Sequence, residues 1–399
     1  MNPFATKLLR IVTSVPVITL MLVGCAEIFM RSFNIPSTFG YRSSDSWQIS
    51  DRLAYCLKTV PDVTIVGSSL MLPLNQDGSG AHFYTGMHTP YLTELLTRAS
   101  GEPIECLNLA TGRQTVAEAY LIEKAVSSRK RYPKVLIYGL ILREFVDEYY
   151  AGEWRGESFG AVAPYAPADL QSVGKIYSNR GMLDFLFSHY LYLYRDRSAI
   201  RNVLSANTKD FLDLMPLDMP YSRMYNFVQK PQHQGLLFER LTPQNMEAMM
   251  HEVNKRNPQN VRNTFRQHFT SMHAYPPRNA WKMQHHYLKS LADLCDEKEV
   301  LLVLVNMPIS KEFQAIAPKG SYEGFQQWLD ELSQKWGFFL VDLAFDPDFT
   351  EDRFKDGLHL DYEGSRILAR KIVNALERDY PTILRTMAEE ARERKSRER

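Results

Sequence analysis

Five short apolar runs constrain the fold of this chain more than any other feature of its sequence. They lie at residues 63–66, 104–109, 135–140, 300–305 and 338–343. Short runs of aliphatic and β-branched residues, ended by glycine or polar residues, are typical of buried β-strands. Amphipathic segments of helical length separate several of these runs. The pattern therefore predicts an α/β protein, with a parallel sheet and helices packed on its faces.

The first apolar run stops abruptly at Gly67, Ser68 and Ser69. A turn after a buried strand presents its side chains at the carboxyl edge of a parallel sheet, where open α/β sheets bind their ligands. A serine hydroxyl becomes a useful nucleophile when an imidazole accepts its proton and a carboxylate orients that imidazole. Asp356 and His359 follow the fifth run and are three residues apart, so one loop can supply both groups. We therefore predict that Ser69, His359 and Asp356 converge.

The alternation of strands and helices breaks between residues 145 and 279, where the chain is aromatic and interrupted by prolines. The aromatic-rich segment 182–194 fits the core of an insertion, a lid over the site or a membrane-facing patch. We predict six parts along the chain. They are an amino-terminal anchor (1–33), a linker (34–62), the first part of the α/β domain (63–144), an insertion subdomain (145–279), the second part of the α/β domain (280–380) and a charged tail (381–399).

The amino-terminal segment is apolar enough to interact with a membrane. Two basic residues precede residues 11–26, which carry no charge, and Glu27 and Arg31 follow. Sixteen helical residues rise about 24 Å, against a hydrocarbon core of about 30 Å. Residues 28–33 can extend the apolar face past Glu27. The segment therefore predicts a single-pass signal anchor.

Two other kinds of amino terminus also fit this pattern. Residues 22–25, Leu-Val-Gly-Cys, resemble a bacterial lipobox, which would make Cys25 a lipidated residue. The residues after Cys25 are apolar, which is more typical of a continuing anchor than of a lipoprotein tether. A plain cleaved signal is the third possibility. All three place the bulk of the chain outside the cytoplasm, in the periplasm or at the cell surface.

The composition argues against several classes of protein. Basic residues number 47 and acidic residues 46, a formal net charge of +1, which gives no electrostatic footprint for nucleic acid. The four cysteines lack the spacing of metal ligands and are too few for a disulfide framework. We expect no nucleic-acid partner, no metal and no other cofactor.

Three segments resemble sequence blocks of the SGNH (GDSL-like) hydrolases. Residues 67–70 (Gly-Ser-Ser-Leu), 108–112 (Asn-Leu-Ala-Thr-Gly) and 356–360 (Asp-Gly-Leu-His-Leu) match the first, second and fifth blocks, and the resemblance covers residues 63–140 and 300–376. It implies a flavodoxin-like three-layer fold for the five-stranded parallel sheet predicted above. The resemblance does not cover the large insertion, which the sequence pattern predicts to be mostly helical.

The same resemblance implies functions for individual residues. Ser69 would be the nucleophile, His359 the general base and Asp356 its orienting partner. The backbone N–H groups of Ser69 and Gly112 would form the oxyanion hole. Asn108 and Arg143 are further candidates for contacts with the substrate.

The sequence departs from the family pattern at two positions. Ser68 stands where the family usually has aspartate, a residue that is not the proton acceptor. The third block normally supplies an oxyanion-hole asparagine two residues after a glycine, but Gly139 is followed there by Ile141. Losing one oxyanion donor typically costs about 10²–10³-fold in rate. Arg143 or a residue of the insertion is the candidate replacement.

Within this superfamily, the anchor, the Gly-Ser-Ser block and the insertion look most like membrane-anchored proteins of cell-surface polymer acylation. Examples are the D-alanylation protein of lipoteichoic acid synthesis and polysaccharide O-acetylation proteins. The resemblance implies an extracytoplasmic serine esterase or acyltransferase that acts on acyl esters of a cell-surface glycan or polymer. The alternative, motivated by Ile141, is a non-catalytic partner of a membrane-bound O-acyltransferase or a polysaccharide export system.

Overall fold

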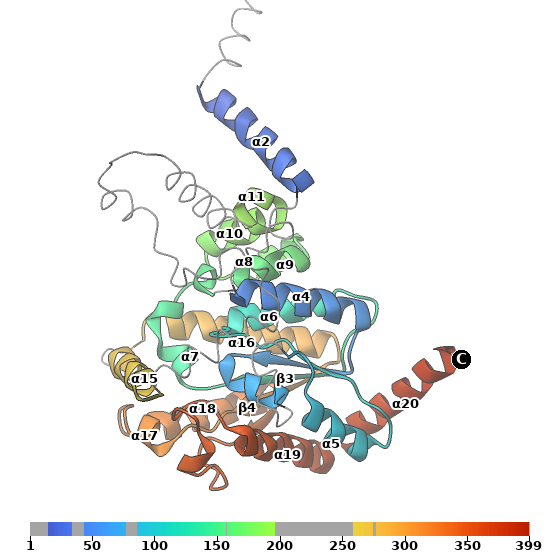
Figure 1. The fold of residues 1–399 in the computed structure, drawn as a ribbon, viewed down its shortest axis with the longest axis vertical. Helices are drawn as coiled ribbons and strands as arrows, with labels where there is room; N and C mark the ends of the chain where they lie inside the picture. Colours follow the sequence, from blue (N-terminus) through green and yellow to red (C-terminus); the bar gives the residue numbers. More distant parts are fainter. Residues whose placement is uncertain are drawn as a thin grey trace, which may run out of the picture. The chain divides into compact units, whose positions relative to one another are not determined.

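The computed structural model (Figure 1) describes residues 15–33, 44–76, 86–156, 158–195, 258–273 and 277–398. The chain divides into two compact units. The smaller consists of Met1–Ser43 and Leu186–Thr242, and the larger of Ser44–Phe185 and Pro243–Arg399. The region predicted as one insertion subdomain is therefore shared between the two units.

The larger unit is built on a five-stranded parallel sheet with the order β2-β1-β3-β4-β5. This is the strand order of flavodoxin-like doubly wound sheets. Strands β1, β2 and β3 are buried along their whole length, as expected for strands covered on both faces. The predicted five-stranded parallel α/β sheet is confirmed. Its strands are β1 (Val63–Gly67), β2 (Cys106–Asn108), β3 (Val135–Leu140), β4 (Leu301–Asn306) and β5 (Phe339–Asp342).

Helices cover both faces of this sheet. Helices α4, α6 and α16 lie on one side and α5 and α19 on the other, with α6 packed against α16 and α5 against α19 (Figure 1). Their bounds are α4 (Ser44–Thr59), α5 (Pro90–Ser100), α6 (Val116–Ser127), α16 (Ala280–Glu297), α18 (Ser321–Trp336) and α19 (Tyr362–Asp379).

Local signals determine where several helices begin. Thr115 and Glu118 form a capping box at the start of α6, so that each side chain binds the other's backbone N–H. Pro90 is the first residue of α5, a position where its missing N–H costs nothing. Asp361 caps α19 by accepting a hydrogen bond of 2.6 Å from the N–H of Gly364.

Residues 34–62 are predicted as a linker, but part of this segment forms helix α4. Ile49, Leu53 and Cys56 lie four and three residues apart, which is the spacing of one helical face, and all three are buried. The helix packs against α6 and against α8 (Phe159–Val162). The surrounding polar residues conceal this short apolar stripe in the sequence.

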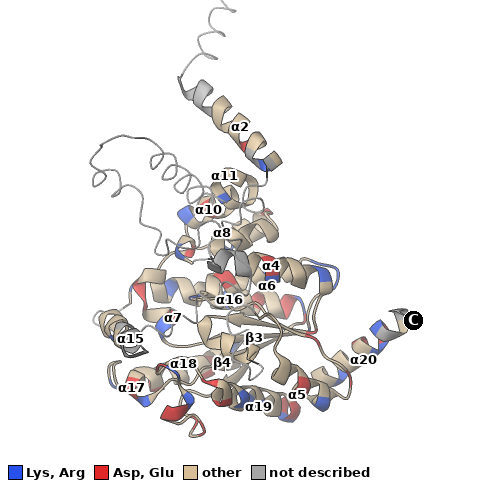
Figure 2. Cartoon of the chain, viewed as in Figure 1, with Lys and Arg blue, Asp and Glu red and all other residues tan. Residues whose placement is uncertain are grey.

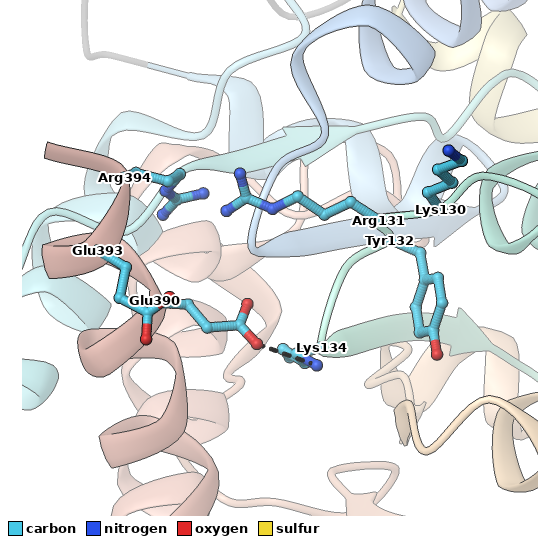
Figure 3. A pocket seen from close by; sticks show the side chains of 7 residues that line it. All are labelled: Lys130, Arg131, Tyr132, Lys134, Glu390, Glu393 and Arg394. Carbon is cyan, nitrogen blue, oxygen red and sulfur yellow. Dashed lines mark ion pairs between the residues drawn. The ribbon is translucent and has the colours of Figure 1, made fainter. Parts of the chain in front are cut away.

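Residues 381–398, in the predicted charged tail, make helix α20 (Pro381–Glu398). Leu384 and Met387 are buried on one face of this helix. Further along the helix, Glu390 pairs with Lys134 at 3.0 Å (Figure 3), and Arg394 pairs with Asp62. Acidic and basic side chains are mixed along α19 and α20 (Figure 2). The dense charge of the tail conceals the two apolar anchors.

The described chain between β3 and α16 is helical. Its elements are α7 (Arg143–Val146), η2 (Glu148–Tyr150), η3 (Glu153–Arg155), α8, η4 (Ala163–Tyr165), α9 (Leu170–Val173), α10 (Asn179–Tyr190), α11 (Tyr192–Arg195) and α15 (Pro258–His273). The remaining short elements are η1 (Ser69–Asn75), α17 (Lys311–Gln314) and η5 (Glu351–Arg353). This helical content agrees with the predicted character of the insertion.

In the smaller unit, helix α2 (Val15–Phe33) is joined to the corner between α10 and α11. The Glu27 carboxylate accepts hydrogen bonds from the N–H groups of Tyr192 (2.5 Å) and Leu193 (2.8 Å) at the start of α11. Arg31 pairs with Glu27 at 2.7 Å and donates to the carbonyl oxygen of Tyr190. Both charges that follow the apolar stretch therefore have protein partners.

The predicted anchor is only partly covered by the described residues, because residues 1–14 lie outside them. None of the helices in the described ranges combines the length and the apolar character needed to cross a membrane. The side chains of Met21, Leu22, Val23, Ile28 and Phe29 on α2 are exposed.

Glu123 on α6 is an acidic side chain buried in the helical layer. It is 1% exposed, and neither of its carboxylate oxygens has a hydrogen-bond partner among the described residues. Burial raises its pKa to about 8. Burial also raises the pKa of the thiols of Cys56 and Cys295, and the charge of Glu123 adds to both shifts.

We predict that Glu123 makes the stability of the protein depend on pH. Its folded-state pKa lies above the value of 4.5 expected for the unfolded chain. The folded protein therefore holds the proton more tightly, and the free energy of unfolding falls as pH rises through this window, by about 1.4 kcal/mol per unit. Glu123→Gln should match the stability of the wild type at about pH 5, where Glu123 is protonated in the folded protein, and should exceed it at about pH 9, where Glu123 is ionised.

Urea unfolding of both proteins at these two pH values measures this difference. Cys56→Ala, which leaves the carboxyl group in place, is the control and should keep the pH dependence of the wild type. If Glu123→Gln loses stability with pH as steeply as the wild type, Glu123 is not the group responsible.

Candidate active site

The end of β1 is shaped to project Ser69. Gly67, the last residue of β1, has a φ of 135°, a conformation that favours glycine. A Cβ at this position would lie 2.7 Å from the carbonyl oxygen of Gly139 and 2.9 Å from the Met71 side chain. Ser69 then begins the short helix η1, in which Met71 donates its N–H to the carbonyl of Ser68.

The loop between β5 and α19 supplies Asp356 and His359. A bridge between Phe354 and Leu360 closes this loop, and the N–H of Lys355 donates to the carbonyl of His359 at 2.8 Å. The loop is thus a tight hairpin that holds both functional side chains on one short segment.

Gly357, between the two functional residues, attaches the loop to the rest of the domain. Its φ is 88°, and a side chain there would collide with the ring of Phe313 on α17. Its carbonyl oxygen accepts a hydrogen bond of 3.1 Å from the N–H of Ser310. The position of the loop therefore depends on the segment that follows β4.

The structure brings Ser69, His359 and Asp356 together as the sequence predicts. Ser69 Oγ lies 2.7 Å from His359 Nε2, and His359 Nδ1 lies 2.7 Å from Asp356 Oδ2. The second carboxylate oxygen, Asp356 Oδ1, accepts hydrogen bonds from the N–H groups of Leu358 (3.1 Å) and His359 (2.9 Å). These distances are those of a nucleophile, a base and an orienting carboxylate.

The electrostatics keep Asp356 in its ionised form. Burial alone would raise its pKa, but the hydrogen bonds from His359 and Leu358 outweigh that effect and lower the pKa of the carboxyl group. An ionised Asp356 can only accept, so the proton of the neutral imidazole belongs on His359 Nδ1. Nε2 is then left with a lone pair directed at the hydroxyl of Ser69.

The chain beyond β2 places Gly112 beside the nucleophile turn. The N–H of Leu109 donates to the carbonyl of Ile65 at 2.7 Å, and that of Thr111 donates to the carbonyl of Gly67 at 3.2 Å. Within the described ranges, the N–H groups of Ser69 and Gly112 have no acceptor in the protein. Both amides are therefore free to bind an oxyanion.

Two buried side chains that sequence reasoning missed hold this turn in place. Gln114 accepts a hydrogen bond of 2.6 Å from the N–H of Gly67 and donates to the carbonyl of Leu109 at 2.9 Å. Arg52 on α4 donates to the carbonyl of Ala110 at 2.7 Å. Gln114 precedes a capping box and Arg52 lies in the segment predicted as a linker, so neither carries a sequence signal of its function.

Asn108, predicted to contact the substrate, is fully buried. Its Nδ2 donates to the carbonyl of Met71 and to Asn75 Oδ1, both at 2.9 Å, and its Oδ1 accepts from the N–H of Ala110 at 2.9 Å. These bonds join β2 and the oxyanion turn to η1. The side chain thus supports the site from behind, and a contact between Asn108 and the substrate stays a prediction.

Ile141 and Arg143 follow β3 at the same edge of the sheet. Ile141 is 1% exposed and offers no polar group. Arg143, the first residue of α7, is 8% exposed, and its guanidinium makes no hydrogen bond or ion pair with any described residue. Burial raises the pKa of the adjacent Glu144 to about 7, although the charge of Arg143 opposes this shift. A buried cation without a paired carboxylate is costly, which favours an anionic ligand at this position.

Over the same described ranges, no cluster of three or more histidine, cysteine, aspartate or glutamate side chains could hold a metal ion.

Comparisons with known proteins add little to this geometry. No family model and no curated protein sequence matches the chain. A solved structure from Desulfitobacterium hafniense DCB-2, assigned to the lipolytic G-D-S-L family, covers 79% of this chain and 98% of its own. The two share 11% sequence identity with a TM-score of 0.32. The description of the site rests on the distances given above.

We predict that Asn108 is required for stability. Asn108→Ala removes three hydrogen bonds and leaves buried polar groups unpaired, so the free energy of unfolding should fall by about 2–3 kcal/mol. Gln327→Ala, on the exposed side of α18, is the control and should stay within about 0.5 kcal/mol of the wild type. Urea unfolding measures both. Equal stability of the two variants would contradict the structural function of Asn108.

Proposed function

We propose that this protein is a serine esterase or O-acyltransferase of the SGNH type. The observation that carries the proposal is the continuous chain of hydrogen bonds from Ser69 through His359 to Asp356, with both links at 2.7 Å. The N–H groups of Ser69 and Gly112, which find no acceptor among the described residues, lie on the adjoining turns. Together these groups form the arrangement that acyl transfer through a covalent intermediate requires.

In the proposed reaction, Ser69 Oγ attacks the carbonyl carbon of an ester while its proton passes to His359 Nε2. The negative charge that develops on the carbonyl oxygen is held by the N–H groups of Ser69 and Gly112. Asp356 stabilises the imidazolium, which then gives its proton to the departing alcohol oxygen. Water or a glycan hydroxyl attacks the resulting acyl-enzyme, and His359 again takes the proton and returns it to Ser69.

We also propose that Arg143 supplies the donor that Ile141 cannot. It lies four residues beyond Gly139, which pairs with Gly67, and Ser69 lies two residues beyond Gly67. Because β1 and β3 are neighbours in the sheet, both side chains belong to the same edge. A mostly buried guanidinium that has no hydrogen bond or ion pair with the described residues is suited to hold a developing oxyanion at this edge.

Attachment to the cell membrane through the amino terminus remains part of the proposal, with the body of the protein outside the cytoplasm. The exposed apolar side chains on α2 support it, as does the binding of Glu27 and Arg31 to the α10–α11 corner. Cys25 is exposed on the same helix and is the residue that the lipoprotein alternative would modify. An acylated cell-surface glycan or polymer is the substrate that this location favours.

We predict that the full-length protein, kept in detergent or in isolated membranes, takes up one fluorophosphonate label on Ser69. The label should be lost in Ser69→Ala and in His359→Ala, because the imidazole activates the hydroxyl. Ser68→Ala, at the buried neighbouring serine, is the matched control and should keep the label. Intact mass and a labelled peptide identify the site.

Extraction of the labelled membranes with alkaline carbonate tests attachment to the membrane, because an anchored protein stays in the pellet.

The second candidate function is that of a non-catalytic partner of a membrane-bound O-acyltransferase or a polysaccharide export system. Ile141, which gives no side-chain donor to an oxyanion, is the observation that favours it. A correctly folded wild type that takes no label, together with cellular acylation that survives Ser69→Ala, would support this function and contradict the enzymatic one.

The part played by Arg143 can be measured on a soluble acetate ester. If its guanidinium binds the oxyanion, Arg143→Met should lower kcat by about 10²-fold with little change in KM. Arg143→Lys keeps the charge and should retain more activity than Arg143→Met. Thermal unfolding of both variants checks that they fold. An unchanged kcat with a raised KM would instead show that Arg143 only binds the ground-state substrate.

A further inference from the structure

An apolar cavity of about 510 Å³ lies beside the carboxyl edge of the sheet, in the larger unit. Ligand sites in proteins have volumes of about 300–1,000 Å³, and this cavity falls in that range. Its walls come from α7, the end of α15, the start of α16 and the start of α18. The apolar residues that matter most are Leu142, Val146, Met272, Trp281, Pro318 and Phe325.

The lining residues carry no formal charge. His273 is the only ionisable side chain among them, and burial lowers its pKa, which favours the neutral ring. Its Nε2 is buried without a hydrogen-bond partner among the described residues. The cavity therefore suits an apolar group and offers little to a glycan, whose hydroxyl groups would be left unpaired.

Strand register places one wall residue of this cavity and the proposed nucleophile after neighbouring strands, at the same edge of the sheet. Leu142 is three residues beyond Gly139, and Gly139 pairs with Gly67 in β1. Ser69 is two residues beyond Gly67. Because neighbouring strands lie about 4.8 Å apart, the segments that carry Leu142 and Ser69 leave the sheet from adjacent positions at one edge.

A second set of contacts connects the cavity to the loop of Asp356 and His359. Gly357 in that loop lies against the ring of Phe313. The Phe313 ring packs edge-on against Phe269 of α15, with 5.0 Å between ring centroids. The last turn of α15 then supplies Met272 and His273 to the cavity. His268 also holds α15 on α7, through a contact of 2.8 Å with Asp147.

We propose that this cavity binds the acyl chain of the substrate. The inference rests on the proposed function, because it assumes that Ser69 receives the acyl group. Of the two parts of an ester between a fatty or other aliphatic acid and a glycan, only the acyl part is apolar. The cavity therefore favours an enzyme that transfers or hydrolyses acyl groups longer than acetyl.

Gly324 on α18 offers a way to block the cavity without disturbing the fold. It lines the cavity, and a Cβ built on it meets no heavy atom within 4 Å. Its backbone is helical, so any L-residue fits, and replacing a helical glycine is favourable for helix stability. Gly324→Phe should therefore fold and occupy cavity space, whereas Gly324→Ala changes the helix in the same way but leaves the cavity open.

The test compares hydrolysis of p-nitrophenyl acetate, butyrate and octanoate by the full-length protein. For wild type and Gly324→Ala, kcat/KM should rise by about fourfold for each methylene that is buried, until the cavity is full. In Gly324→Phe, the ratio of kcat/KM on octanoate to kcat/KM on acetate should fall at least about tenfold below the wild-type ratio. Ser321→Phe, on the same wall, should have the same effect.

Three results would overturn the inference. A wild type that hydrolyses acetate but shows no dependence on acyl length contradicts the cavity assignment alone. A wild type that is inactive on all three esters and takes no fluorophosphonate label contradicts the proposed function, and the cavity assignment with it. If Gly324→Phe instead changes discrimination among acetate esters of longer and shorter alcohols, the cavity binds the alcohol and the acyl assignment is wrong.

Discussion

The parallel register of β1 with β2 and β3 is the constraint on which the rest of the site depends. Gly67 pairs with Gly139 on one side, and its carbonyl accepts the N–H of Thr111 on the other. The close approach of these backbones leaves no room for a Cβ at Gly67, and it puts three loop beginnings at one edge of the sheet. That register also determines the positions of three site residues, since each follows one of the paired strands by a few residues. They are Ser69, Gly112 and Arg143.

The loop of Asp356 and His359 is held at this edge by hydrogen bonds to one side chain and not by strand pairing. Asp356 accepts two backbone N–H groups with one carboxylate oxygen and the imidazole with the other, so a single carboxylate both folds the loop and orients His359. The same hydrogen bonds lower the pKa of Asp356 despite its burial. The hydrogen bonds within the loop therefore keep the Asp356 carboxylate ionised, and this negative charge is in place to stabilise an imidazolium before any substrate binds.

The parts that sequence reasoning predicted are those whose signals are local. A buried strand ending at Gly67 and an Asp-x-x-His spacing can each be read from a few residues, and together they predicted the convergence of Ser69, His359 and Asp356. The parts it missed depend on distant neighbours. Arg52 and Gln114 look like ordinary polar residues until the turn that they brace is known. The apolar stripes of α4 and α20 are short and surrounded by charge, so only their packing partners reveal them.

Ile141 offers no polar group at this edge of the sheet, and a neighbouring residue can supply one. An isoleucine leaves an oxyanion with fewer neutral donors, but Arg143, two residues later, carries a guanidinium that the described residues leave unpaired. Leu142, between them, turns to the wall of the apolar cavity. Residues 141–143 after β3 therefore supply two apolar side chains and one charged group. Such an arrangement suits an ester, whose carbonyl oxygen gains charge during the reaction while its acyl chain stays apolar throughout.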